Sequence, residues 1–145
     1  MKTMKILFAA LMFVLCSSQS FGWVHGKFDL IEAQFGKGTK ISDNCYAWTV
    51  GKMRISMLMK FNPNRACYEV TYQTQFEQLP EQEVSNWINM QLSLNSGDHT
   101  GKQWSWKFLG KHPTGTMFWI RADGAFKAAY ERKTGFHELM IYLNQ

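Results

Sequence analysis

The chain has few cysteines and few prolines, and it has no apolar run long enough to cross a bilayer. Its 145 residues include three cysteines and three prolines. The longest apolar run, residues 6–16, is about half of the roughly 20 residues that a spanning helix needs. The His-Glu-x-x-His pattern of zinc enzymes and the Gly-x-Ser-x-Gly pattern of serine hydrolases are also absent. These absences argue against a disulfide-rich scaffold, a transmembrane segment and the common hydrolase classes.

Residues 1–22 have the layout of a secretory signal peptide. Lys2 and Lys5 precede the apolar run, and small and polar residues follow it at 17–22. Cleavage after Gly22 places the small residue Ser20 three positions before the new N-terminus, and cleavage after Ser20 fits almost as well. The sequence therefore predicts a signal peptide at 1–22 and a single exported globular domain at 23–145, located in the periplasm or secreted.

Cys16 raises the alternative of a lipoprotein signal, which also ends its apolar run at a cysteine. The residue before that cysteine is small in such signals, and here it is Leu15. We therefore expect no lipid anchor on Cys16.

Two cysteines, Cys45 and Cys67, remain in the exported domain. Cysteines in an oxidising compartment usually pair. The closed loop would contain about 22 residues and stabilise the fold by about 3 kcal/mol. We expect a Cys45–Cys67 disulfide. A free catalytic thiol is the alternative, and no Cys-His signature supports it.

Residue patterning predicts an α+β domain, mostly an antiparallel sheet with one amphipathic helix packed on it. Alternation of apolar and polar residues predicts strands, and turn residues separate them. A small β-barrel with an inserted helix is the alternative. The expected strands cover residues 45–50, 52–61, 66–76, 104–108, 116–122, 125–132 and 136–143, with a further first strand at 27–35.

The single helix is expected at about 80–94. Pro80 suits a helix start, and acidic residues follow it in the first turn. Val84, Trp87, Ile88 and Leu92 have the spacing of an apolar helical stripe. We therefore place Trp87 in the core rather than in a binding site.

Charge and histidine spacing limit the classes of ligand. Without Lys2 and Lys5, fourteen basic and eleven acidic residues remain, so the exported domain has a net charge of +3. The basic residues are scattered, which argues against nucleic acid as a partner. The four histidines lack metal-site spacing. We expect no metal, no cofactor and no catalytic residues.

Aromatic residues offer the main candidates for ligand binding. Trp104 and Trp106 fall on one face of a predicted strand, and Trp23 stands at the start of the exported domain. Tryptophan rings form rigid stacking surfaces, and they also form cores. Asp98 and His99 lie in a glycine-containing loop, where their polar groups could meet a ligand.

The function that the sequence favours is non-enzymatic binding of a protein partner in the cell envelope or outside the cell. Such a protein could be an accessory factor, an inhibitor or an immunity-type factor. A module that binds carbohydrate or peptidoglycan through its tryptophans is the second hypothesis, with a glycan as its partner. A small secreted hydrolase is the third, although the separated carboxylates give it little support.

Overall fold

The computed structural model describes residues 24–50, 55–74, 80–98 and 100–145, which form one antiparallel sheet and two helices. Helix α2 (Phe28–Phe35) precedes four strands: β1 (Thr39–Ser42), β2 (Cys45–Val50), β3 (Ile55–Phe61) and β4 (Cys67–Thr74). Helix α3 (Glu81–Leu94) precedes four more: β5 (Trp106–Lys111), β6 (Met117–Arg121), β7 (Phe126–Lys133) and β8 (Phe136–Leu143). The described residues thus repeat the order of one helix and four strands.

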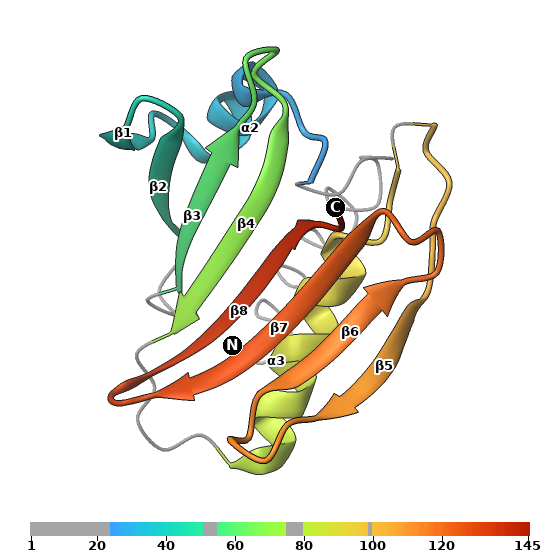
Figure 1. Ribbon diagram of the computed structural model, residues 1–145. Coiled ribbons are helices and arrows are strands. Elements are labelled where there is room, and N and C mark those ends of the chain that lie inside the picture. Colours follow the sequence, from blue (N-terminus) through green and yellow to red (C-terminus); the bar gives the residue numbers. More distant parts are fainter. Residues whose placement is uncertain (1–23, 51–54, 75–79, 99) are drawn as a thin grey trace, which may run out of the picture.

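The two halves join through their last strands. The strand order is β1-β2-β3-β4-β8-β7-β6-β5, and all neighbours run antiparallel (Figure 1). Strands β4 and β8 pair at the middle, from Glu69 opposite Tyr142 to Thr74 opposite His137. The predicted antiparallel sheet is confirmed. The barrel alternative is wrong, because β1 and β5 are edge strands at opposite ends of an open sheet.

Helix α3 follows the predicted pattern closely. Pro80 precedes its first residue, Glu81 and Glu83 lie in its first turn, and no side chain caps its N-terminus. Acidic side chains at this end interact favourably with the helix dipole. The buried side chains recur at helical spacing and form one stripe, as expected of a helix that packs on a sheet: Val84, Trp87, Ile88, Gln91 and Leu92.

A second helix, α2, occupies the segment expected to be a first strand, so that prediction was wrong. Phe28 and Ile31 are buried three residues apart, and Gly36 ends the helix with a φ of 81°. Its ψ is −173°, and this combination of a positive φ with an extended ψ is adopted essentially only by glycine. The apolar spacing and Gly36 were the available helix signals, but eight residues give a weak periodicity.

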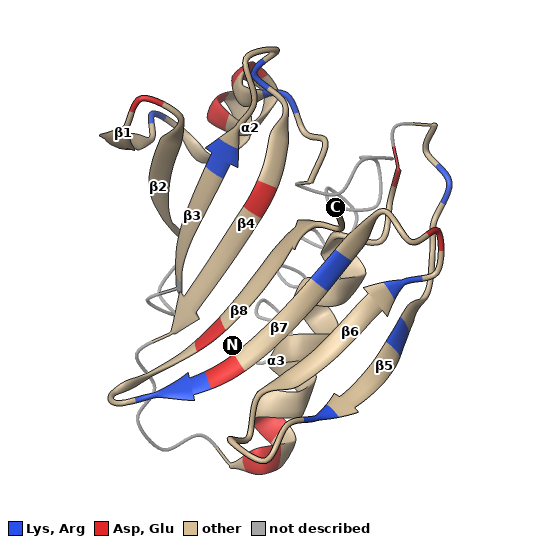
Figure 2. Ribbon diagram, viewed as in Figure 1, with Lys and Arg blue, Asp and Glu red and all other residues tan. Residues whose placement is uncertain are grey.

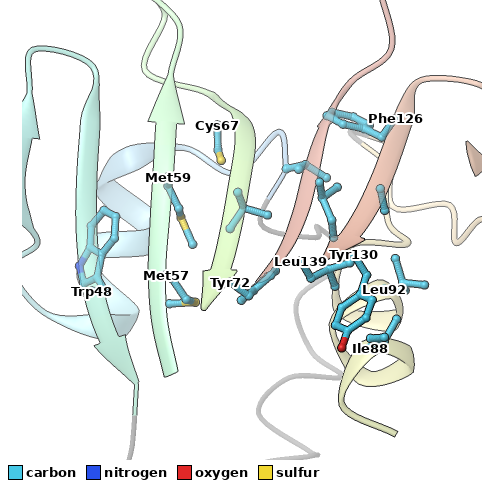
Figure 3. Close-up of a cluster of buried hydrophobic side chains, with 14 of the residues drawn as sticks. Trp48, Met57, Met59, Cys67, Tyr72, Ile88, Leu92, Phe126, Tyr130 and Leu139 are labelled. Carbon is cyan, nitrogen blue, oxygen red and sulfur yellow. The ribbon is translucent and has the colours of Figure 1, made fainter. Parts of the chain in front are cut away.

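Both helices pack on the same face of the sheet. Alternate residues of the central strands enter one core with Phe28 and Ile31 of α2 and the buried stripe of α3. Figure 3 shows part of this cluster, with Ile88 and Leu92 beside Tyr130 and Leu139. The strand residues of the core are Trp48, Met57, Met59, Phe61, Cys67, Val70, Tyr72, Phe126, Ala128, Tyr130, Leu139 and Ile141. Neither described helix packs on the opposite face of the sheet.

The two cysteines do not form the expected disulfide; both are free and buried. Cys45 lies opposite Lys60, on the face away from the helices. A bulge shifts the register between β3 and β4, so that Cys67 lies opposite Phe61 and joins the core. Strand β3 also separates the two, and two strand spacings are about 10 Å, beyond the roughly 7 Å that a disulfide spans between Cα atoms. Burial raises the pKa of the Cys67 thiol to about 12.

Reducing agent should therefore leave the stability unchanged. We expect the same melting temperature with and without dithiothreitol, because no covalent loop is lost from the unfolded chain. Thiol titration after unfolding should find both Cys45 and Cys67 reactive. A drop of several degrees on reduction would contradict the separation of the two thiols.

Trp87→Ala should lower the free energy of unfolding by about 3–5 kcal/mol, as expected for truncating a core tryptophan. Trp87 is 6% exposed, and its Nε1 has no hydrogen-bond partner among the described residues. Trp87→Phe should therefore cost much less, because it keeps an aromatic ring and removes a buried unpaired donor. Denaturant unfolding measures both, with Met90→Ala on the exposed side of the same helix as the control. Equal losses in Trp87→Ala and Met90→Ala would contradict the packing.

Candidate functional site

Asp98 organises the loop that connects α3 to β5. The backbone N–H and hydroxyl of Thr100 donate to Asp98 Oδ1 at 2.8 and 2.6 Å, and the Lys102 N–H donates to the same oxygen at 3.1 Å. Trp104 Nε1 donates to Oδ2 at 2.7 Å. These donors, the Thr100 hydroxyl first, hold the pKa of the Asp98 carboxyl well below its usual range. Both oxygens of the Asp98 carboxylate therefore accept hydrogen bonds that hold the loop in its conformation.

Two of the three predicted binding tryptophans use their indole N–H groups within the protein. Trp104 bonds to Asp98, and Lys102 Nζ lies 3.8 Å from the centre of its ring. Trp106 donates to the Leu92 carbonyl at 2.8 Å and packs against the core. The structure thus brings Asp98 and Trp104 into direct contact. Trp23 and His99 lie outside the described residues.

A buried polar network lies beside this loop, and sequence reasoning missed it. Arg121 is 1% exposed and forms an ion pair with Asp123 at 2.7 Å. Its Nη1 also donates to the carbonyls of Asn95 and Gly97, at 3.2 and 2.8 Å. The Asn95 side chain donates to the Tyr72 hydroxyl at 2.8 Å. A buried arginine is stable only with such partners, so this network is structural.

The described residues bring few titratable side chains together. Among the described residues, no three His, Cys, Asp or Glu side chains lie close enough together to hold a metal ion. The hydroxyl of Tyr130 and Nδ1 of His137 are 2.7 Å apart, but both residues are buried in the sheet.

None of the described helices has the length and apolar character that crossing a membrane requires.

The sheet face away from the helices carries a continuous row of small and apolar residues, which we call the central row. The strand registers place these residues side by side across six strands. Thr71 at the middle is 7% exposed and the others are half-buried. In Figure 1, β6 and β7 pass in front of α3, so the view is onto this face. From β2 to β6, the central row is Ala47, Leu58, Thr71, Met140, Ala129 and Phe118.

Charged residues flank the central row, and most of them are paired. Lys60 Nζ lies 2.8 Å from Glu69, and Lys133 Nζ lies 2.8 Å from Glu138. The bond to Glu69 raises the pKa of Lys60. Figure 2 shows a basic residue on β3, an acidic residue on each of β4 and β8 and residues of both signs on β7, whereas β5 carries only basic ones. The region of the face around β3, β4 and β8 is therefore close to neutral.

The region of the face formed by β5, β6 and β7 is basic. Lys107 and Lys127 lie on either side of Ile120 in one cross-strand register. Neither forms an ion pair within the described part of the chain. This region thus combines the apolar side chains of Phe118 and Ile120 with the positive charges of two lysines that have no ion-pair partner among the described residues.

We compared the chain with known proteins. No family model, curated protein or solved structure matches it.

Asp98→Asn should destabilise the fold at neutral pH, because an amide cannot accept hydrogen bonds at both positions. The pKa of Asp98 is lowered by folding, so its contribution is complete above the unfolded-state pKa, near 4, and is lost as the pH falls toward the folded-state value. The difference in melting temperature between wild type and variant should be largest at pH 7 and smaller at pH 3. The exposed Asp29→Asn serves as the control, and a difference that grows on acidification would contradict this role.

Proposed function

We propose that the chain is an exported, non-enzymatic binding protein, and that the sheet face away from the helices is its contact surface for a protein partner. The observation that carries this proposal is the central row, which crosses six strands without a described helix over it. Antiparallel sheets commonly leave one face to solvent, and that face is then mostly polar. Here apolar side chains remain at its centre, as in the core of a protein interface.

The charges indicate what kind of protein surface fits. Lys107 and Lys127 flank Ile120 and lack internal partners in the described structure. A partner with carboxylates around an apolar centre would pair with them, and opposite charge would speed the encounter. We therefore propose an acidic protein surface as the partner, and weaker binding at high salt.

Binding of a glycan by the two tryptophans receives less support. The indole N–H groups of Trp104 and Trp106 already bond to Asp98 and Leu92, and Lys102 occupies one face of the Trp104 ring. A sugar would have to use the remaining ring surface, without indole hydrogen bonds.

Site-specific photocrosslinking tests the contact surface. A photoreactive phenylalanine analogue replaces Ala129 in the central row, and in a matched protein it replaces Met90 on α3, which is 47% exposed. Both proteins are irradiated with extracts of the cell envelope and the medium of the producing cell. We expect one dominant protein adduct from position 129 and none of that mass from position 90.

Charge reversal then tests the partner's chemistry. Lys127→Glu should reduce the yield of this adduct at least tenfold, whereas Lys102→Glu, in the loop before β5, should leave it unchanged. An adduct formed equally from positions 90 and 129, or one insensitive to Lys127→Glu, would contradict the proposed surface. Adducts with glycan alone would instead support the hypothesis that the chain binds carbohydrate or peptidoglycan.

A further inference from the structure

A separate cleft lies on the helix side of the sheet, where α2 meets the β1–β2 and β3–β4 turns, near the top of Figure 1. Its volume is about 430 Å³, within the range of sites that bind small ligands. Three aromatic side chains, Phe28, Tyr46 and Phe61, form its apolar part. Their ring centres lie 4.7 to 6.1 Å apart, so they form one cluster.

Arg65 lies at the rim of this cleft, and its guanidinium packs on the Phe28 ring. The group lies 4.2 Å from the centre of the Phe28 ring. Its only ion pair among the described residues is a contact of 3.8 Å with Asp29, and both side chains are more than half exposed. An ion pair this exposed contributes little to the stability of the fold. No described residue accepts a hydrogen bond from the guanidinium, so its planar donors remain available.

The backbone at Arg65 is unusual for a side chain of this size. Its φ is 58°, in the left-handed region that glycine and asparagine adopt more readily. Two hydrogen bonds fix it there: Arg65 N–H donates to the Asn62 carbonyl at 2.8 Å, and the Arg65 carbonyl accepts from the Phe28 N–H at 2.9 Å. Strained positions of this kind often mark functional sites.

Asn62 supplies a second donor at the same turn. Its side-chain oxygen accepts from the Ala66 N–H at 3.0 Å, and its amide NH₂ group donates to no described residue. Arg65 and Asn62 thus offer donors beside an aromatic wall. Asp43, also on the rim, forms an exposed pair with Lys40 at 3.1 Å. A nearby carboxylate would disfavour a doubly charged phosphate more than a singly charged ligand.

We propose that this cleft binds a carboxylate attached to an aromatic or apolar body. The carboxylate pairs with the planar fork of the Arg65 guanidinium, which matches it with two parallel hydrogen bonds. The Asn62 amide donates to the same group, and the body of the ligand packs against Tyr46 and Phe61. This site is separate from the sheet face proposed for the protein partner, so either proposal can fail alone.

N-acetylphenylalanine and its primary amide are matched probes, because they differ only in the carboxylate. Titrations are followed by NMR shifts of the Asn62 and Arg65 amide signals in the purified protein. We expect the acid to bind about tenfold more tightly than the amide, the difference that one charge-assisted hydrogen bond supplies. Phenyl phosphate, as a dianion, should bind more weakly than the acid.

Arg65→Asn is the decisive variant, because asparagine tolerates a positive φ and the variant keeps the turn. It should bind the acid and the amide equally. Lys102→Gln, a loss of positive charge elsewhere on the surface, should keep the tenfold preference. Equal binding of the two probes by the wild type, no binding of either, tighter binding of phenyl phosphate, or a preference that survives in a folded Arg65→Asn protein would each overturn the proposal.

Discussion

The antiparallel pairing of β4 with β8 is the interaction on which the rest of the structure depends. Within the described residues, it joins two units of one helix and four strands, and it aligns Val70 with Ile141 so that both halves contribute to one core. On the opposite face of the same seam, Gln73 Nε2 donates to Glu138 at 2.8 Å. Without this pairing, each half would be a four-stranded sheet with one helix and only the marginal core that so short a chain can bury.

The seam also determines which surfaces remain for function. Both described helices cover the same face of the joined sheet, and the Asn95–Arg121 network connects the end of α3 to β6. The other face then extends across both halves, which gives the central row its length. The aromatic cleft has a different origin: it forms where α2 meets the β3–β4 turn, within the first half alone. A contact surface for a protein and a site for a small carboxylate can therefore coexist on this fold.

Much of the fold was predictable from local patterns, and little of the site was. Alternation along the strands and the stripe around Trp87 predicted most of the sheet and α3, because burial on one face imposes these periods. Helix α2 was missed because eight residues carry little periodicity. The disulfide was predicted wrongly, because the bulge that turns Cys67 toward the core is invisible in the sequence. The Arg65 cleft joins a helix and two turns distant along the chain, so no spacing rule could have indicated it. The placement of Trp104 and Asp98 in a ligand site stays a prediction.

Amide hydrogen exchange, measured by NMR across the sheet, tests most directly whether one seam unites the two halves. If it does, the hydrogen-bonded amides of β4 and β8 should be among the slowest to exchange in the protein. Their free energy of opening should equal that of global unfolding and match the slowest amides of β3 and β7. Rapid exchange along β4 and β8, or one half opening well before the other, would contradict the single-sheet account and with it the continuous face proposed for binding.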